Sequence, residues 1–320
     1  MKRNVLIDLH THGIGRYDTR TSRPGDILKM AELHAKAGTS AVLPTIYSGT
    51  IERMRLNMEA VRIAMALQAQ RGRVQKSNPH TPPLLKGGNV SIVTRHPVPS
   101  DTGRHSSLIL GVHLEGPFLN PIRCGAQDKK SFIKPCIPDL KSLIDGYEDV
   151  IKIITIAPEI PGALKVIERC ASLGIRVNMG HSDATFNQAL KGKKAGATGI
   201  SHIFNAMRPF HHREPGLAGF GLTDDDIYIE VIADGFHLEV NTLKLITRTK
   251  RPDRIILVSD TVKGAGQGKR SIHSKSGLLA GSAVTLSDAV NNLVRAGIPR
   301  REVLKFVSDN PMTYLRSGVI

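Results

Sequence analysis

The sequence predicts an α/β fold, the (β/α)8 or TIM barrel, in which eight parallel strands alternate with helices. Three observations support this prediction. Eight short, almost wholly apolar segments recur along the chain, as expected for strands that are buried on both faces. Stretches of helical periodicity separate several of them. Histidines and carboxylates follow the segments at the points where the strands should end, and barrels of this kind carry their functional residues at the strand carboxyl ends.

The first half of the chain contains four expected strands, at residues 5–13, 39–45, 108–115 and 150–157. A helix over residues 24–37 separates the first two, because Pro24 suits the first helical position and Gly38 suits the position after the last turn. A longer helix is expected over about residues 51–70, where methionine and valine recur on one face. Such a stripe is typical of core packing.

The second half repeats the alternation, with strands expected at residues 175–180, 199–201, 227–233 and 254–260. Helices are expected at about residues 162–173, 286–296 and 301–308. One more helix should connect the fifth strand to the sixth, with Ser182 or Asp183 as its N-cap and Gly196 at its end. We therefore predict one catalytic barrel domain over residues 1–320.

One segment departs from this pattern, at about residues 72–107. It contains five prolines and lies in a stretch with no acidic residue between Glu59 and Asp101. Such a composition is typical of a flexible insertion. Because the segment follows a helix and precedes a strand, we expect it on the face opposite the strand carboxyl ends.

The overall charge is strongly basic, with 44 Lys and Arg against 28 Asp and Glu, and the pI is about 10.0. The charges are scattered and only 4% of residues are aromatic, so we expect no nucleic-acid partner, although the surface would attract anionic metabolites. No run reaches the roughly 18 apolar residues of a membrane span. Cys124, Cys136 and Cys170 form no CxxC motif, which suits a reducing compartment, so we predict a cytoplasmic protein without a membrane partner.

The strand ends predict a metal site. His10 and His12 are two residues apart in the first strand and therefore point to the same face. The later strand ends contribute nitrogen and oxygen ligands of the same kind: Glu115, His181, His202, His237 and Asp260. Parallel strands bring their carboxyl ends to one side, so these side chains should meet in one pocket. A pocket rich in nitrogen and oxygen suits Zn²⁺ or a similar divalent ion.

Five motifs then point to a known family: HLEGPF (113–118), GHSDAT (180–185), SHIFNAMRPFHHREPGLAG (201–219), IADGFH (232–237) and VSDTVKGAG (258–266). They resemble the N-acetylglucosamine-6-phosphate deacetylases of the amidohydrolase superfamily. The resemblance implies one or two divalent metal ions, with Zn²⁺ as the first candidate. Glu115, His181 and His202 would hold the main ion, and His10 and His12 would hold a second ion that shares Glu115.

The resemblance also implies a substrate and a reaction. The substrate would be N-acetylglucosamine 6-phosphate, and the products glucosamine 6-phosphate and acetate. Asp260 would be the catalytic acid and base, taking a proton from water and returning it to the leaving amine. The sugar phosphate would be contacted by Ala126, Asn205, Ala206, Arg213, His237, Leu279, Ala280 and Gly281.

One feature departs from the family pattern. Relatives usually carry a small β-sandwich built from segments on either side of the barrel, and we expect both halves to be absent here. A barrel-only variant and a truncated reading frame both stay open, as does homodimer formation. The alternatives for function are a deacetylase of another N-acetyl-hexosamine phosphate and a non-catalytic relative that binds a sugar phosphate.

Overall fold

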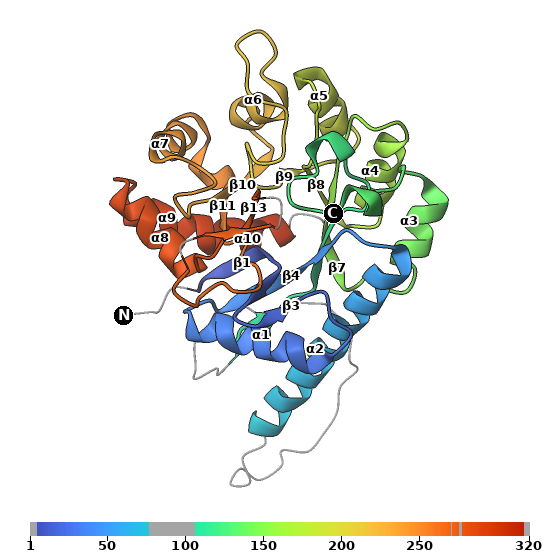
Figure 1. Cartoon of the computed structure of the whole chain (residues 1–320), viewed down its shortest axis with the longest axis vertical. Coiled ribbons are helices and arrows are strands. Elements are labelled where there is room, and N and C mark those ends of the chain that lie inside the picture. Colours follow the sequence, from blue (N-terminus) through green and yellow to red (C-terminus); the bar gives the residue numbers. More distant parts are fainter. Residues whose placement is uncertain (1–4, 77–105, 270, 275–276, 317–320) are drawn as a thin grey trace, which may run out of the picture.

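The computed structural model describes residues 5–76, 106–269, 271–274 and 277–316. Within these residues, helices surround a barrel of parallel strands (Figure 1). The eight barrel strands follow one another around the sheet in the order β1 (Ile7–Thr11), β4 (Ala41–Tyr47), β6 (Val112–Glu115), β7 (Ile151–Ile156), β8 (Arg176–Met179), β9 (Gly199–Ile200), β10 (Tyr228–Ile232) and β11 (Ile255–Val258). This order confirms the predicted barrel.

The barrel closes between β11 and β1. The backbone nitrogen of Asp260 donates to the carbonyl of His10 at 2.8 Å, and the backbone nitrogen of Ser259 donates to Asp8 Oδ1 at 3.1 Å. Closure places the ends of β1 and β11 side by side, although these strands are far apart in the sequence.

Shorter strands decorate the barrel. β5 (Leu108–Ile109) pairs with β4 before the chain enters β6. Two antiparallel pairs, β2 (Gly13–Ile14) with β3 (Tyr17–Asp18) and β12 (Ile272–His273) with β13 (Leu279–Gly281), lie in the loops that follow β1 and β11. These loops therefore build up the rim at the strand carboxyl ends.

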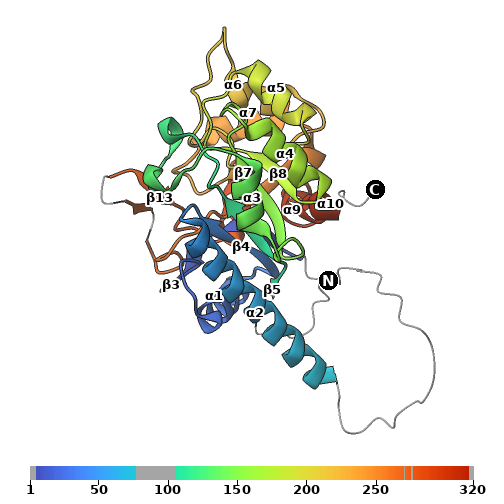
Figure 2. The ribbon, with the colours of Figure 1, turned by 90° about the vertical axis from the view of Figure 1, so that its right-hand side faces the viewer.

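The helices form the outer layer: α1 (Pro24–Lys36), α2 (Ile51–Lys76), α3 (Ile137–Ile144), α4 (Ala163–Ser172), α5 (Phe186–Lys194), α6 (Gly216–Thr223), α7 (Val240–Thr249), α8 (Leu286–Arg295), α9 (Arg300–Val307) and α10 (Asp309–Arg316). The end of α2 extends away from the barrel (Figure 2). Apolar side chains between strands and helices form the main core, and a second apolar cluster fills the barrel interior around Ile7, Leu43, Ile153 and Tyr314. Among the described residues, every helix is too short or too polar to cross a membrane.

The predicted helices at residues 24–37, 162–173, 286–296 and 301–308 match α1, α4, α8 and α9 closely. The prediction gave no range for α3, α6, α7 or α10. α6 illustrates why, because all but its last residue are buried and three of its residues are glycines, so it has no polar face to reveal a helical period.

The predicted N-cap of α5 is wrong. Thr185 caps this helix and forms a capping box with Gln188. Ser182 and Asp183 are engaged elsewhere: Ser182 Oγ donates to Glu159, and the Asp183 carboxylate accepts from Arg123 and Arg208. The predicted end is confirmed, because Gly196 follows the C-cap with φ of 113°.

Both ends of the predicted insertion at 72–107 fall within described, ordered elements or contacts. α2 continues through Lys76, and Ser107 is buried, with its backbone nitrogen donating to Ala31 O at 3.0 Å and its Oγ donating to Thr39 O at 2.7 Å. Thr39 precedes β4, so Ser107 lies at the strand amino ends, opposite the candidate site. Residues 77–105, where most of the predicted insertion falls, lie outside the described residues.

Candidate metal centre

The candidate metal ligands come from four strand ends on the same side of the barrel. His10 lies in β1, His12 is the first residue after that strand, and Glu115 is the last residue of β6. His181 and His202 each lie two residues beyond a strand, β8 and β9 respectively. All five side chains are buried, so the barrel holds a cluster of polar groups where a purely structural core would be apolar.

Glu115 lies at the centre of this cluster. Its Oε1 is 2.9 Å from the Nε2 atoms of both His181 and His202 and 3.5 Å from that of His10. Its Oε2 is 3.2 Å from His12 Nε2. The one carboxylate therefore joins two ligand groups, one with His181 and His202 and the other with His10 and His12. A shared carboxylate is the arrangement that lets two metal ions lie close together.

Backbone carbonyls orient three of these imidazoles. The Nδ1 atoms of His12, His181 and His202 lie 3.0, 2.9 and 3.3 Å from the carbonyl oxygens of Thr45, Arg123 and Asn205. A carbonyl oxygen can only accept a hydrogen bond, so each Nδ1 carries the proton. In the neutral ring the lone pair then lies on Nε2, the atom that faces Glu115, and this is the tautomer that a metal ligand requires.

The burial of these groups supports a metal centre in a second way. His10 Nε2 is wholly buried and has no hydrogen-bond partner among the described residues. A buried nitrogen without a partner costs free energy unless an absent group satisfies it. A divalent ion held by imidazole nitrogens and carboxylate oxygens fits this position, and Zn²⁺ accepts such a ligand set.

The charges around Glu115 compensate one another. Burial alone would raise the pKa of Glu115, but the surrounding histidines, His181 first, hold it well below its usual value. Burial lowers the pKa of His181, and the Glu115 carboxylate more than reverses this effect. Glu115 is therefore ionised within the cluster.

The backbone is strained at the same positions. His181, His202 and Asp260 adopt positive φ angles of 47°, 29° and 50°, in the left-handed region that residues with a Cβ rarely occupy. Each such residue costs on the order of 1–3 kcal/mol, and residues of this kind cluster at functional sites. This strain is an indication of function that is independent of the ligand distances.

Asp260 faces the histidines from the end of β11. Its Oδ1 lies 3.5 Å from His12 Nε2 and 3.7 Å from His10 Nε2. Its side chain is 12% exposed, more than that of Glu115 at 3%, so it reaches the cavity while remaining beside the cluster. A carboxylate placed in this way can exchange protons with a bound molecule.

A cavity of about 670 Å³ opens above the cluster, and most of the predicted substrate contacts line it. The structure brings together Ala126, Asn205, Ala206, His237, Leu279, Ala280 and Gly281 around this cavity, with His12, Glu115, His181, His202 and Asp260 at its floor. His237 is held in place by Asp234, whose Oδ2 is 2.7 Å from His237 Nδ1. Burial lowers the pKa of His237, but Asp234 outweighs it and the net shift is upward.

Arg213 is the one predicted substrate contact that the structure does not bring to this cavity. Its side chain is exposed on the loop before α6, and it is not among the lining residues. Among the described residues, two other cations line the cavity, Arg20 and Lys263. Arg20 is engaged by both carboxylate oxygens of Asp18, whereas Lys263 forms no ion pair within the part of the chain that is described.

Several residues around the site escaped the sequence analysis. Gln127 Nε2 donates to Glu115 Oε2 at 2.6 Å, and no sequence signal marks it in its loop. Tyr47 stacks on His12 with ring centroids 3.8 Å apart. Glu230 lies within the apolar segment of β10, and a lone glutamate in a buried strand was a signal that could have been read.

No family model matches the chain, but known proteins are similar to it over nearly its whole length. N-acetylgalactosamine-6-phosphate deacetylase of Escherichia coli O157:H7 is 30% identical, over 97% of this chain and 77% of that protein. N-acetylglucosamine-6-phosphate deacetylase of Lysinibacillus sphaericus is 29% identical, over 97% of this chain and 75% of that protein.

Two solved structures extend the similarity to the fold. N-acetylglucosamine-6-phosphate deacetylase of Thermotoga maritima superposes with a TM-score of 0.80 at 28% identity, over 98% of this chain and 78% of that one. A variant of the Mycobacterium smegmatis enzyme, in complex with N-acetyl-D-glucosamine-6-phosphate, superposes with a TM-score of 0.77 at 25% identity, over 98% of this chain and 77% of that one. Both superpositions cover almost the whole of this chain.

Proposed function

Because this chain belongs to the N-acetylglucosamine-6-phosphate deacetylase family of the amidohydrolase superfamily, we propose that it hydrolyses the acetamide of N-acetylglucosamine 6-phosphate to acetate and glucosamine 6-phosphate. The family membership supports the broader class of substrate, an N-acetylhexosamine 6-phosphate. The observation that carries the proposal is the position of Glu115, His181 and His202 beside Asp260 at the floor of one cavity.

Glu115, His181 and His202 would hold one divalent ion, and His10 and His12 would hold a second that shares Glu115. A bound ion of this kind polarises the acetamide carbonyl and lowers the pKa of water toward neutrality. Gln127 keeps Glu115 in place by donating to its Oε2, and Thr45, Arg123 and Asn205 keep the imidazoles turned toward the cavity.

Asp260 is the proposed proton carrier. Its carboxylate accepts the proton that water loses as it attacks the carbonyl carbon, and it then donates that proton to the nitrogen of the sugar. The second transfer is needed because an unprotonated amine is a poor leaving group. The backbone of Asp260 is fixed on both sides, by His10 O and by the nitrogen of Ser282, so its carboxylate stays in position for both transfers.

The phosphate needs a cation, and Lys263 is the cation lining the cavity that forms no ion pair within the described residues. We assign the phosphate to the part of the cavity that Lys263 lines; His237 and the Leu279–Gly281 strand line the same cavity. The phosphate role that the resemblance gives to Arg213 stays a prediction, because this side chain lies outside the cavity.

A second candidate substrate is N-acetylgalactosamine 6-phosphate. It is favoured by the similarity of this chain to N-acetylgalactosamine-6-phosphate deacetylase of Escherichia coli O157:H7, with 30% identity over 77% of that protein. The two sugars differ in the orientation of one hydroxyl group, so the two candidates use the same metal ligands and the same proton carrier.

Acetate release tests the proposal and ranks the two sugars. Metal-loaded protein should release acetate from N-acetylglucosamine 6-phosphate with a higher kcat/KM than from N-acetylgalactosamine 6-phosphate, and far faster than from unphosphorylated N-acetylglucosamine. The reverse order of the two phosphates would favour the second candidate. If the wild type releases acetate from both sugar phosphates no faster than an Asp260→Asn variant does, deacetylase function is contradicted.

A further inference from the structure

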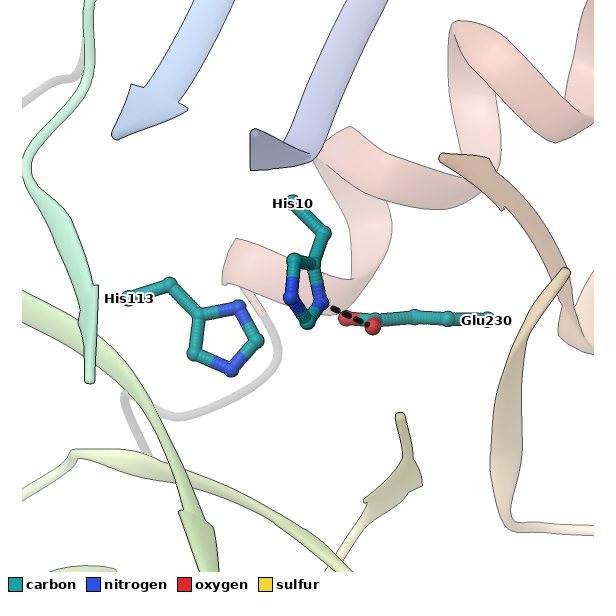
Figure 3. A group of neighbouring side chains, drawn as sticks. All are labelled: His10, His113 and Glu230. Carbon is teal, nitrogen blue, oxygen red and sulfur yellow. Dashed lines mark hydrogen bonds and ion pairs between the residues drawn. The ribbon is translucent and has the colours of Figure 1, made fainter. Parts of the chain in front are cut away.

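A buried carboxylate lies behind the candidate metal ligands, on the side away from the cavity. Glu230, in β10, is 2% exposed. Figure 3 shows its carboxylate beside the ring of His10, with His113 on the other side of that ring. Glu230 Oε2 is 2.9 Å from His10 Nδ1, so the two side chains share a hydrogen bond inside the barrel.

We propose that Glu230 is a positioning residue that fixes the tautomer and the orientation of His10, and so sets the affinity of the ion bound by His10 and His12. The proposal rests on the two-ion centre described above. It gives Glu230 no contact with substrate. Its effect reaches the site only through the imidazole of His10.

The direction of each hydrogen bond around Glu230 follows from its neighbours. Thr198 Oγ1 donates to the hydroxyl of Tyr314, and that hydroxyl donates to Asn178 Oδ1. The amide of Asn178 is thereby fixed with its nitrogen toward Glu230, and Nδ2 donates to Oε1 at 2.8 Å. Oε1 is thus occupied by one donor, and Oε2 is left to accept from His10.

This chain of donors determines where the proton of His10 lies. Because a carboxylate oxygen accepts, Nδ1 of His10 carries the proton and Nε2 carries the lone pair. Nε2 is the atom that faces Glu115 Oε1 at 3.5 Å and Asp260 Oδ1 at 3.7 Å, and it has no hydrogen-bond partner among the described residues. His12, His181 and His202 use backbone carbonyls for the same purpose, so His10 is the one proposed ligand of the five whose support is a charged side chain.

His10, His113 and Glu230 lie close enough to suggest a third metal site, but their hydrogen bonds argue against it. His113 Nδ1 lies 3.2 Å from the carbonyl of Leu9, which can only accept, so this nitrogen donates. His113 Nε2 lies 2.8 Å from Thr155 Oγ1 and accepts from it. Both nitrogens of His113 are therefore occupied by hydrogen bonds and cannot bind a metal ion. His113 and Glu230 instead surround the ring of His10, a proposed ligand of the two-ion centre.

A glutamine at position 230 could not reproduce this arrangement. Its amide has one accepting and one donating end, whereas Asn178 and His10 both donate to Glu230. In Glu230→Gln, the new NH2 group would face either the donating Nδ2 of Asn178, which places two donors against each other, or the Nδ1 of His10. The second choice moves the proton of His10 to Nε2 and blocks the lone pair. Loss of such a supporting partner typically lowers metal affinity by about 10–100-fold.

The test measures metal content per chain at buffered concentrations of free Zn²⁺, for wild type, Glu230→Gln, His10→Gln and the double variant. Glu168→Gln is the matched control, because it makes the same change at an exposed position of α4. Glu230→Gln should weaken one of the two ions by about 10–100-fold and leave the other unchanged. Because Glu230 acts through His10, the double variant should bind metal no more weakly than His10→Gln alone.

Losses that add in the double variant would show a general structural role and overturn the proposal. The proposal would also be overturned if Glu230→Gln bound both ions within threefold of the wild-type affinity. It would fail as well if the wild type held no ion whose binding is lost in His10→Gln. If Glu230→Gln fails to fold, Glu230→Asp replaces it: the shorter side chain withdraws the carboxylate from His10, so the His10-dependent ion should weaken while the other ion stays, and unchanged binding of both ions would refute the proposal. Since metal content is measured without substrate, a protein that binds two ions but releases no acetate would reject the proposed function and leave this inference intact.

Discussion

Replacing Asp260 with asparagine should remove most turnover while leaving the fold and the metal content in place. The substitution keeps the size of the side chain but removes the group that can accept and return a proton. The hydrogen bonds that hold this position use its backbone: its nitrogen donates to His10 O and its carbonyl accepts from Ser282, both at 2.8 Å. Asparagine also tolerates the φ of 50° found here, so the backbone has no reason to move.

The expected loss follows from the role of the carboxylate. General acid–base catalysis by one positioned group contributes about 10²–10⁴-fold in rate, and Asp260 serves two proton transfers in one reaction. In free energy this is about 3–5 kcal/mol of the barrier. The distances of 3.5 and 3.7 Å from Asp260 Oδ1 to the nearest histidine nitrogens place the carboxylate beside the metal ligands without direct hydrogen bonds to them, so metal content should change little.

The assay is acetate release from N-acetylglucosamine 6-phosphate under saturating substrate, with elemental analysis and circular dichroism on the same samples. Asp253→Asn is the control, since that carboxylate precedes β11, at the opposite end of this strand from Asp260, and its side chain is 50% exposed. An Asp260→Asn variant that folds, holds its metal and turns over within threefold of wild type would refute the assignment of Asp260 as proton carrier.

Three further predictions address the metal count, the phosphate and the pH dependence. His10→Gln with His12→Asn should lower the metal content from two ions to one by elemental analysis and keep part of the activity; an unchanged count would contradict the two-ion centre. Lys263→Ala should raise KM for the phosphorylated sugar about tenfold or more, the value of a lost charged hydrogen bond, and Arg213→Ala made in parallel shows whether the exposed arginine contributes as well. Burial lowers the pKa of His34 from 6.5 to about 4, so the unfolded chain takes up a proton at His34 as the pH falls through 6.5, while the folded chain does not. Urea unfolding of the wild type should therefore show about 2 kcal/mol of stability lost between pH 7.5 and 5 that His34→Gln does not lose. Equal losses in both proteins would reject this origin.

Much of the fold and of the site follows from short-range patterns. Buried parallel strands are apolar along their whole length, so the eight runs were visible, and their ends are fixed by where apolar residues stop. His181 and His202 could be placed together because parallel strands share one carboxyl face. Glu115 could be added for the same reason, although its central position between both ligand groups follows only from the folded barrel.

The features that sequence could not supply depend on contacts between distant segments. The N-cap of α5 was wrong because Asp183 is drawn to Arg123 and Arg208, which no local pattern reveals. Arg213 lies outside the cavity because the path of a long loop, and not its motif, decides where its side chain points. Glu230 contacts a histidine 220 positions earlier in the chain, and only barrel closure brings the two together.

The dependence of acetate release on bound metal tests the whole account most directly. Protein stripped with a chelator should release no acetate from N-acetylglucosamine 6-phosphate, and activity should return in step with the metal bound per chain as Zn²⁺ is added back. Stripped protein that remains folded and releases acetate at the rate of the loaded protein would contradict a metal centre built on Glu115, His181 and His202.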